Sequence, residues 1–167
     1  MDYITYYSSP VGELTLASDG VSLIGLWFEG QKYYKATLSK DNKEYNELEV
    51  FTLTKKWLDA YFNNEKPSIS DLPLAPRGTE FRKLVWKLLC EIPYGETTTY
   101  KNLSEKVALI MGRESMSNQA IGGAVGHNPI SIIIPCHRVI SVSGNLTGYA
   151  GGIDNKFKLL KIEGEWN

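Results

Sequence analysis

The amino-acid sequence predicts an α+β fold in two parts: an N-terminal antiparallel sheet with a covering helix, then a mostly helical C-terminal domain. Residues 4–28 alternate short runs of β-branched and aromatic residues with turn residues, which is typical of an antiparallel meander. Apolar residues recur at three- and four-residue intervals from about Asn46 to Asn63, which indicates an amphipathic helix. From residue 77 onward most apolar residues again follow helical spacing. Together these observations define the fold class.

Three strands are expected in the N-terminal sheet. They are Ile4–Tyr7, Glu13–Ser18 and Val21–Phe28. A turn rich in Ser, Pro and Gly separates the first two strands, and Asp19-Gly20 separates the next two. This half of the chain has no pattern typical of a catalytic site, so its aromatic residues are expected to form the core.

A proline-rich segment follows the covering helix. Residues 66–76 contain three prolines and no apolar period, which predicts a linker running over the surface. We place the domain boundary near Pro76. The expected domains are therefore residues 1–76, an N-terminal α/β domain with its linker, and residues 77–167.

Four helices are expected in the second domain. Thr79 fits the N-cap of the first helix, which ends before Ile92, and Cys90 near its end is interpreted as a packing residue. On the last helix Phe157 and Leu160 are expected to face inward, with Leu159 as a further candidate. The three later helices span about Thr97–Ala108, Ser115 or Ser117 to Gly126, and Asp154–Glu163.

The helix expected from Ser115 or Ser117 to Gly126 contains the adjacent residues Gly122 and Gly123. An interior glycine costs a helix about 1 kcal/mol relative to alanine, so another factor must favour glycine here. Tight helix–helix packing is one explanation. A helix laid against DNA is the other, because two short helices joined by a turn are typical of a helix-turn-helix. The residues alone do not decide between them.

The sequence Ile132–Val139 contains the strongest candidate for chemistry. The apolar run Ile132–Ile134 predicts a short buried strand that Pro135 ends, leaving Cys136 and His137 at the strand's end. A neighbouring imidazole can convert a thiol into the nucleophilic thiolate, provided that a turn or a water brings the two groups together. A small core cysteine is the alternative.

Other side chains are candidates to complete this site. Glu163 is a possible third member of a Cys/His/acid set, and Tyr100 and Tyr149 are possible hydrogen-bond donors or stacking rings. Such a set would also suit acyl transfer, which needs an oxyanion hole as well.

Composition limits the setting of this site. The chain is 43% hydrophobic and 22% charged, it does not start with a signal-peptide pattern, and no apolar run approaches the roughly 20 residues that span a bilayer. A cytoplasmic protein without a membrane segment is therefore expected. Its two cysteines are expected to be reduced, and two Cys and two His without ligand spacing argue against a metal site. We expect no cofactor, and a monomer.

Charge is distributed unevenly along the chain. Residues 1–76 hold 7 Lys/Arg against 11 Asp/Glu, a net −4, whereas residues 77–167 hold 11 against 8, a net +3. The basic half also contains Cys136. A modest positive excess of this kind is weak support for a polyanionic partner.

The motif Pro135-Cys136-His137-Arg138-Val139, preceded by Asn128-Pro129 and followed by Gly148–Gly152, resembles the active-site region of the O6-alkylguanine-DNA alkyltransferases, also called methylated-DNA–protein-cysteine methyltransferases. The likeness extends from about Arg77 to Glu163 and is weaker before that. It implies a ribonuclease H-like N-terminal domain, and over residues 77–167 a DNA-binding and alkyl-acceptor domain with a helix-turn-helix and an active-site Cys loop.

The resemblance also implies DNA repair by direct reversal. Glu163 would hold His137, which through a water would take the proton of Cys136; the thiolate would then accept the alkyl group from O6 of a flipped guanine. O4-alkylthymine is a second candidate substrate. A thioether has no good leaving group, so the reaction would be stoichiometric and irreversible.

Further roles are implied at matching positions. Tyr100 would rotate the 3′ phosphate and donate to guanine N3, and the carbonyls of Cys136 and Val139 would accept from the exocyclic amine. Tyr149 would flank the base, Ala150 would contact O6 through its backbone N–H, and Asn128 would tie the recognition helix to the active-site loop. The implied partner is double-stranded DNA bearing O6-alkylguanine, bound by Gln119, Ala120, Gly123, Ala124 and Arg138.

The sequence departs from the family at two places. Gln119 occupies a position where the family commonly has an Arg that fills the gap left in the duplex, and residues 108–114 make the connection between the two helices longer than usual. Two other functions stay open at this point: a Cys-dependent hydrolase, and a lesion sensor that binds without reacting.

Overall fold

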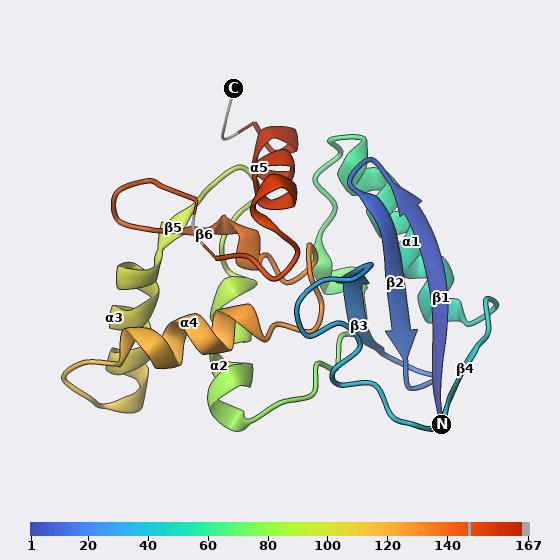
Figure 1. Ribbon diagram of the computed structural model, residues 1–167, viewed down its shortest axis with the longest axis horizontal. Coiled ribbons are helices and arrows are strands. Elements are labelled where there is room, and N and C mark those ends of the chain that lie inside the picture. Colours follow the sequence, from blue (N-terminus) through green and yellow to red (C-terminus); the bar gives the residue numbers. More distant parts are fainter. Residues whose placement is uncertain (147, 165–167) are drawn as a thin grey trace. The chain divides into compact units, whose positions relative to one another are not determined.

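The computed structural model describes residues 1–146 and 148–164. They form two compact units (Figure 1). The first comprises Met1–Arg77 together with the short segment Pro129–Ser131, and the second comprises the rest of the described chain. Among the described residues, no helix is both long and apolar enough to cross a bilayer.

The first unit contains a four-stranded sheet in the order β3-β2-β1-β4. Its antiparallel part confirms the expected meander: β1 (Asp2–Ser9) pairs with β2 (Gly12–Ser18), which pairs with β3 (Leu23–Phe28). The short strand β4 (Asn42–Glu44) was not expected; it runs parallel to β1. Its three residues are polar and exposed, so they carry no strand pattern.

Both faces of this sheet are covered. Helix α1 (Glu49–Phe62) lies along one face and packs against β1, β2 and β3, which confirms the expected covering helix (Figure 1). On β3 every side chain is buried. A buried cluster contains Trp27, whose ring lies across Gly25, so a Cβ at Gly25 would clash with that ring.

Residues 66–76 are not simply a linker running over the surface. A 3₁₀ turn, η1 (Ile69–Asp71), leads to Leu72, which is buried, and Leu74 forms a parallel bridge with Leu23. The Leu23 N–H donates to the Pro73 carbonyl at 2.7 Å. The edge strand β3 thus forms backbone hydrogen bonds with residues 73–75. The proline-rich pattern of this segment did not predict that pairing.

The same strand β3 also pairs with a segment from far along the chain. Leu26 donates to the Pro129 carbonyl at 2.8 Å and accepts from the Ser131 N–H at 2.9 Å, which places Ile130 in a parallel bridge with Leu26. Residues 129–131 therefore belong to the first unit although their neighbours on both sides belong to the second.

The expected strand Ile132–Ile134 is wrong. The three isoleucines are buried as expected, but they lie in a turn, and Ile132 has a φ of 71°. Positive φ is strained for a β-branched residue, so the surrounding packing must hold it. Apolar periodicity predicted the burial correctly but could not distinguish a buried turn from a buried strand.

The second unit is mostly helical, as expected. Side chains of Thr79, Thr99 and Ser117 accept hydrogen bonds from the first turns of the three helices that follow them. Helices α2, α3 and α4 pack against one another (Figure 1). The helices are α2 (Glu80–Leu89), α3 (Tyr100–Met111), α4 (Asn118–Gly126) and α5 (Ile153–Ile162).

Two short features complete this unit. Strand β5 (Thr98–Thr99) pairs in parallel with β6 (Val139–Ile140), and a 3₁₀ turn, η2 (Cys136–Arg138), precedes β6. Helix α5 does not bury all the residues expected. Leu159 and Leu160 are buried, but Phe157 is 43% exposed, and Lys156 is fully buried instead.

Candidate active site

Cys136 begins the 3₁₀ turn η2 and is buried. The turn is closed on both sides: the Cys136 N–H donates to the Ile134 carbonyl at 2.8 Å, and the Arg138 N–H donates to the Pro135 carbonyl at 3.0 Å. Because the backbone turns here, Cys136 and His137 do not point to opposite faces of a strand. The turn therefore removes the alternation that would separate the two side chains on a regular strand.

His137 forms a buried pair with Glu163. Its Nε2 lies 2.6 Å from Glu163 Oε2, and both side chains are fully inaccessible to solvent. Burial alone would raise the pKa of Glu163, but His137 and Arg138 outweigh this effect and lower the pKa to about 2. Glu163 is thus a carboxylate, and it accepts a hydrogen bond from His137 Nε2–H.

This hydrogen bond determines the form of the imidazole. Burial lowers the pKa of His137 although Glu163 opposes the change, so the ring is neutral. With its hydrogen on Nε2, the ring has a lone pair on Nδ1. Nδ1 is buried and has no hydrogen-bond partner within the described part of the chain. The geometry leaves a base with an unused acceptor beside Cys136.

Arg138 shares the same carboxylate. Its Nε donates to Glu163 Oε1 at 2.8 Å, one terminal nitrogen donates to the Ile92 carbonyl at 2.7 Å, and the guanidinium lies 5.8 Å from the Tyr94 ring centre. The residue is only 8% exposed. Arg138 neutralises Glu163, which helps His137 to remain uncharged. Because its guanidinium binds groups of its own unit, we do not retain Arg138 among the DNA contacts.

Lys156 is a site residue that the sequence reasoning missed. Its Nζ donates to the Val139 carbonyl at 2.6 Å and lies 6.0 Å from the Tyr100 ring centre. Burial lowers the pKa of Lys156 to about 8, although the charge of Cys136 opposes this change. The sequence did contain a signal, because Lys156 lies one helical turn before Leu160 and two before Glu163, on the inward face of α5.

The thiol of Cys136 responds to several neighbours. Burial raises its pKa, whereas a hydrogen bond from Asn128 and the positive charge of Lys156 oppose that rise. Asn128 is itself buried, follows the C-cap of α4, and donates through Nδ2 to the Ile134 carbonyl at 2.7 Å. It therefore links the end of α4 to the backbone just before Cys136. The resting residue is a thiol that requires a base.

Tyr100 interacts electrostatically with Cys136, and Tyr149 lies beside His137. The Tyr100 hydroxyl donates to the Gly148 carbonyl at 3.4 Å, and burial together with the charge of Cys136 raises the pKa of Tyr100 to about 12. The Tyr149 ring lies 6.4 Å from the His137 ring at a steep angle. Ala150 follows in a half-buried turn. Tyr100 is thus a neutral hydroxyl that can donate a proton.

The expected DNA-contacting residues on α4 do not all face the same way. Gln119 is exposed and Ala120 is half-buried, but Ala124 is only 2% exposed and its carbonyl accepts from Trp86 Nε1 at 2.8 Å. We therefore do not retain the Ala124 side chain as a DNA contact. Gly123 is half-buried.

The glycines of α4 are not explained by internal packing. Apart from the neighbouring backbone of α4 itself, a Cβ built at Gly122 or Gly123 meets no atom of the described residues within 4 Å. Tight packing against another helix of this chain would have produced close contacts, so that explanation is wrong. The glycines leave an open strip of backbone that another body can approach.

Within residues 1–146 and 148–164, no group of three or more His, Cys, Asp or Glu side chains could hold an ion. Both cysteines are free thiols, and burial raises the pKa of Cys90 to about 11, which keeps it protonated and unreactive.

Comparisons with known proteins show the family of this chain. Residues 80–165 match the family described as 6-O-methylguanine DNA methyltransferase, DNA binding domain, and residues 3–76 match its ribonuclease-like domain. The methylated-DNA–protein-cysteine methyltransferase of Haemophilus influenzae is 44% identical over 161 residues, which cover 96% of this chain and 86% of that protein. The chain belongs to this methyltransferase family.

Other members of the methyltransferase family show the same extent of similarity. The methylated-DNA–protein-cysteine methyltransferase of Methanosarcina barkeri is 45% identical over 163 residues, which cover 96% of each chain. Among solved structures, Mycobacterium tuberculosis OGT in complex with DNA has a TM-score of 0.83 and 40% identity, over 96% of this chain and 92% of that chain. The α+β fold is therefore that of the family.

Proposed function

We propose that this protein repairs DNA by direct reversal, moving the alkyl group of O6-alkylguanine irreversibly to Cys136. The observation that carries the proposal is the buried Cys136 beside a neutral His137, whose Nε2 is bound to Glu163 and whose Nδ1 is unused. Relatives that match nearly the whole chain are named methylated-DNA–protein-cysteine methyltransferases. The class of reaction comes from these relatives, and the assignment of roles comes from the site.

The first step is activation of the thiol. His137 Nδ1 takes the proton of Cys136 through an intervening water, and Glu163 stabilises the imidazolium that forms. Arg138 keeps Glu163 ionised. The new thiolate is buried, so it needs a nearby cation, and Lys156 provides that charge.

The second step is an in-line displacement. The thiolate sulfur forms a bond to the alkyl carbon while the bond from that carbon to O6 breaks, and the bonding electron pair stays with guanine. Tyr100 donates a proton to guanine N3, which neutralises the leaving base. The product is a thioether on Cys136. A thioether offers no good leaving group, so each molecule reacts once.

The base is held by backbone groups and a ring. The carbonyls of Cys136 and Val139 accept from the exocyclic amine, the Ala150 N–H contacts O6, and Tyr149 flanks the base. The Val139 carbonyl already accepts from Lys156 at 2.6 Å, which fixes its direction, and its second lone pair serves the base.

DNA binding is assigned to the domain over residues 77–167. The open glycine strip of α4 supports this assignment, because it allows the helix backbone to approach the minor groove. The exposed Gln119 fills the gap left by the flipped nucleotide, and Ala120 and Gly123 contact the groove. The expected partner is duplex DNA with O6-alkylguanine; O4-alkylthymine is a second candidate. We place the protein in the cytoplasm as a monomer.

Intact-mass measurement after mixing with an oligonucleotide that carries O6-methylguanine tests the proposal. One added methyl group is expected, located at Cys136 by peptide mapping. Cys136→Ser should abolish the transfer, and the matched control Cys90→Ser should not, because burial raises the pKa of Cys90 to about 11 and keeps it a protonated thiol. DNA binding without any added mass would indicate a lesion sensor, and repeated turnover would indicate a hydrolase.

A further inference from the structure

Helix α4 lacks positive charge. Its sequence from Asn118 to Gly126 contains no Lys or Arg. Duplex DNA is a dense polyanion, and proteins gain affinity for it by neutralising phosphates with Lys or Arg side chains. If α4 lies in the groove, as the proposed function requires, a neighbouring segment must supply the cation.

The connection between α3 and α4 contains an arginine, Arg113. Gly112 ends α3 in the left-handed region with a φ of 66°, and the Arg113 N–H returns to the Ala108 carbonyl at 2.9 Å. This bond closes the end of the helix and fixes the Arg113 backbone. Further along, the Ser104 hydroxyl donates to the Met116 carbonyl at 3.4 Å, which ties the connection to α3. Arg113 is therefore held at a defined place just before α4.

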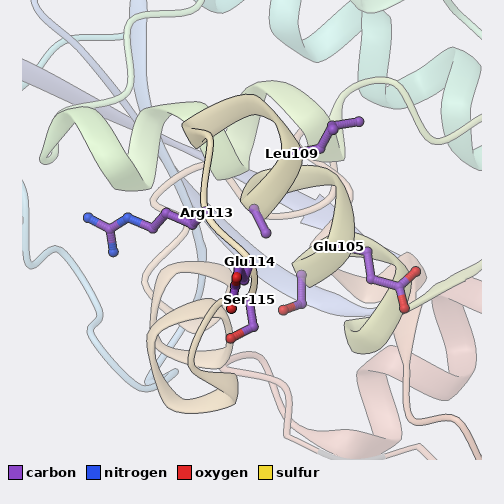
Figure 2. A pocket seen from close by; sticks show the side chains of 7 residues that line it. Glu105, Leu109, Arg113, Glu114 and Ser115 are labelled. Carbon is purple, nitrogen blue, oxygen red and sulfur yellow. The ribbon is translucent and has the colours of Figure 1, made fainter.

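The surroundings of Arg113 leave its charge available. The connection and α3 enclose a surface pocket of about 380 Å³, with the acidic residues Glu105 and Glu114 in its lining (Figure 2). Arg113 is also part of this lining, and Figure 2 shows its side chain extending away from Glu105 and Glu114. Arg113 is exposed, and no carboxylate of the described residues forms an ion pair with it. Its guanidinium is thus directed to solvent.

We propose that Arg113 binds a phosphate of the DNA strand beside α4 and supplies the charge that this helix lacks. The proposal rests on the proposed function, because it requires α4 to contact DNA. A guanidinium is suited to the role, since its planar fork of donors can bind two phosphate oxygens at once. The turn that closes α3 reduces the entropy lost on binding, because the backbone of Arg113 is already fixed.

The test is equilibrium binding of the full chain to an undamaged duplex at several salt concentrations. The logarithm of the binding constant falls with the logarithm of the salt concentration, and each phosphate contact contributes about −0.9 to this slope. Arg113→Ala should therefore show a slope that is less steep by about 0.9, and a weaker affinity at low salt. Arg113→Lys should keep most of the slope. The matched control Lys158→Ala removes an exposed cation from α5 and should leave the slope unchanged.

A second measurement separates binding from chemistry. Methyl transfer from free O6-methylguanine should be equal for Arg113→Ala and the unmodified protein, because the free base has no phosphate. Three outcomes would each overturn the role of Arg113. They are an unchanged salt slope in Arg113→Ala, an equal loss of salt slope in Lys158→Ala, and a slower reaction of Arg113→Ala with the free base. Failure of the unmodified protein to transfer methyl to Cys136 would instead overturn the proposed function, and the comparison of salt slopes would still stand.

Discussion

His137 has two ring nitrogens in different surroundings, and that difference decides which can act as a base. Nε2 donates to a carboxylate that Arg138 already neutralises, while Nδ1 is buried without a partner in the described chain. A single Glu163 opposite His137 would favour the imidazolium; Glu163 shared with Arg138 does so less. The arrangement keeps the imidazole neutral, as the proposed role of His137 as a base requires.

Lys156 is expected to control how readily the Cys136 thiol ionises. Its charge opposes the rise that burial causes in the pKa of Cys136, so Lys156→Gln should raise that pKa further. Less thiolate would then be present at any given pH, and the rate curve should shift to higher pH. At pH 7 the transfer should be slower by about 10- to 100-fold, which corresponds to roughly 1.4–2.7 kcal/mol.

Rates of methyl transfer from free O6-methylguanine between pH 6 and 9 check this expectation. The control is Lys158→Gln, an exposed lysine on the same helix that should change neither rate nor profile. Lys156→Arg keeps the charge and should recover part of the rate. A slower rate with an unmoved pH profile would limit Lys156 to packing.

The sequence predicted part of this site correctly and missed another part. Cys136, His137 and Glu163 were predicted, and the structure brings the latter two together. The pairing of Arg138 with Glu163 was not predicted, because neither residue lies at a spacing that indicates contact. Lys156 was not predicted because the apolar residues alone defined the inward face of α5, although a lysine on that face is itself a signal.

At the scale of elements, α4 combines poor helix formers with a strip of open backbone. Gly122 and Gly123 cost the helix stability, and no packing within the chain requires them. The cost is understandable if the strip faces DNA. Helix α4 is held meanwhile by the Ser117 cap and by packing of Ile121 and Val125.

Gly123→Ala should therefore separate stability from binding. Because the added Cβ meets nothing within 4 Å, the free energy of unfolding should rise by about 0.5–1 kcal/mol in a denaturant titration. Duplex affinity should fall, because the methyl group prevents the closest approach of the backbone. Unchanged affinity together with higher stability would show that DNA does not approach this strip.

Gln119 lies on the exposed face at the start of the same helix. If it holds the base out of the duplex, Gln119→Ala should slow methyl transfer from duplex DNA while transfer from the free base stays the same, because only the duplex pays a few kcal/mol for unstacking. Gln119→Arg should tighten duplex binding and steepen its salt dependence by at most about one counterion. Equal losses on the two substrates would indicate that Gln119 is structural.

The elements were largely predictable, and the exceptions share one cause. Helices α1 to α5 and strands β1 to β3 follow local apolar periodicity, so the sequence indicated them. Strand β4 and the bridge at Leu74 depend instead on partners far along the chain, and the turn at Ile132–Ile134 follows directly on the segment that bridges to Leu26. Local apolar periodicity predicts which residues are buried, but it does not predict which distant strand a segment pairs with.

At the scale of the whole molecule, charge and chemistry are concentrated in the same half of the sequence. Residues 77–167 carry a net +3 and residues 1–76 a net −4, and every candidate site residue lies in the second half. The candidate active site and α4 both belong to the second unit. The first unit contributes no side chain to the proposed chemistry, yet its strand β3 forms backbone hydrogen bonds with residues 129–131.

Because of those hydrogen bonds, residues 129–131 belong to the first unit, whereas the chain on both sides of them belongs to the second. Asn128 and Ile132, at the two crossing points, flank a stretch whose ends are fixed by β3. A fragment of residues 78–167 would lose both hydrogen bonds with Leu26, worth about 1–3 kcal/mol together. The amides of residues 129–139 should exchange with deuterium faster in the fragment than in the full chain, and Cys136 of the fragment should accept methyl more slowly. Equal exchange rates in the fragment and the full chain would show that this segment keeps its conformation without β3. A fragment cut at residue 78 would thus keep every candidate reactive group but lose the strand that pairs with residues 129–131.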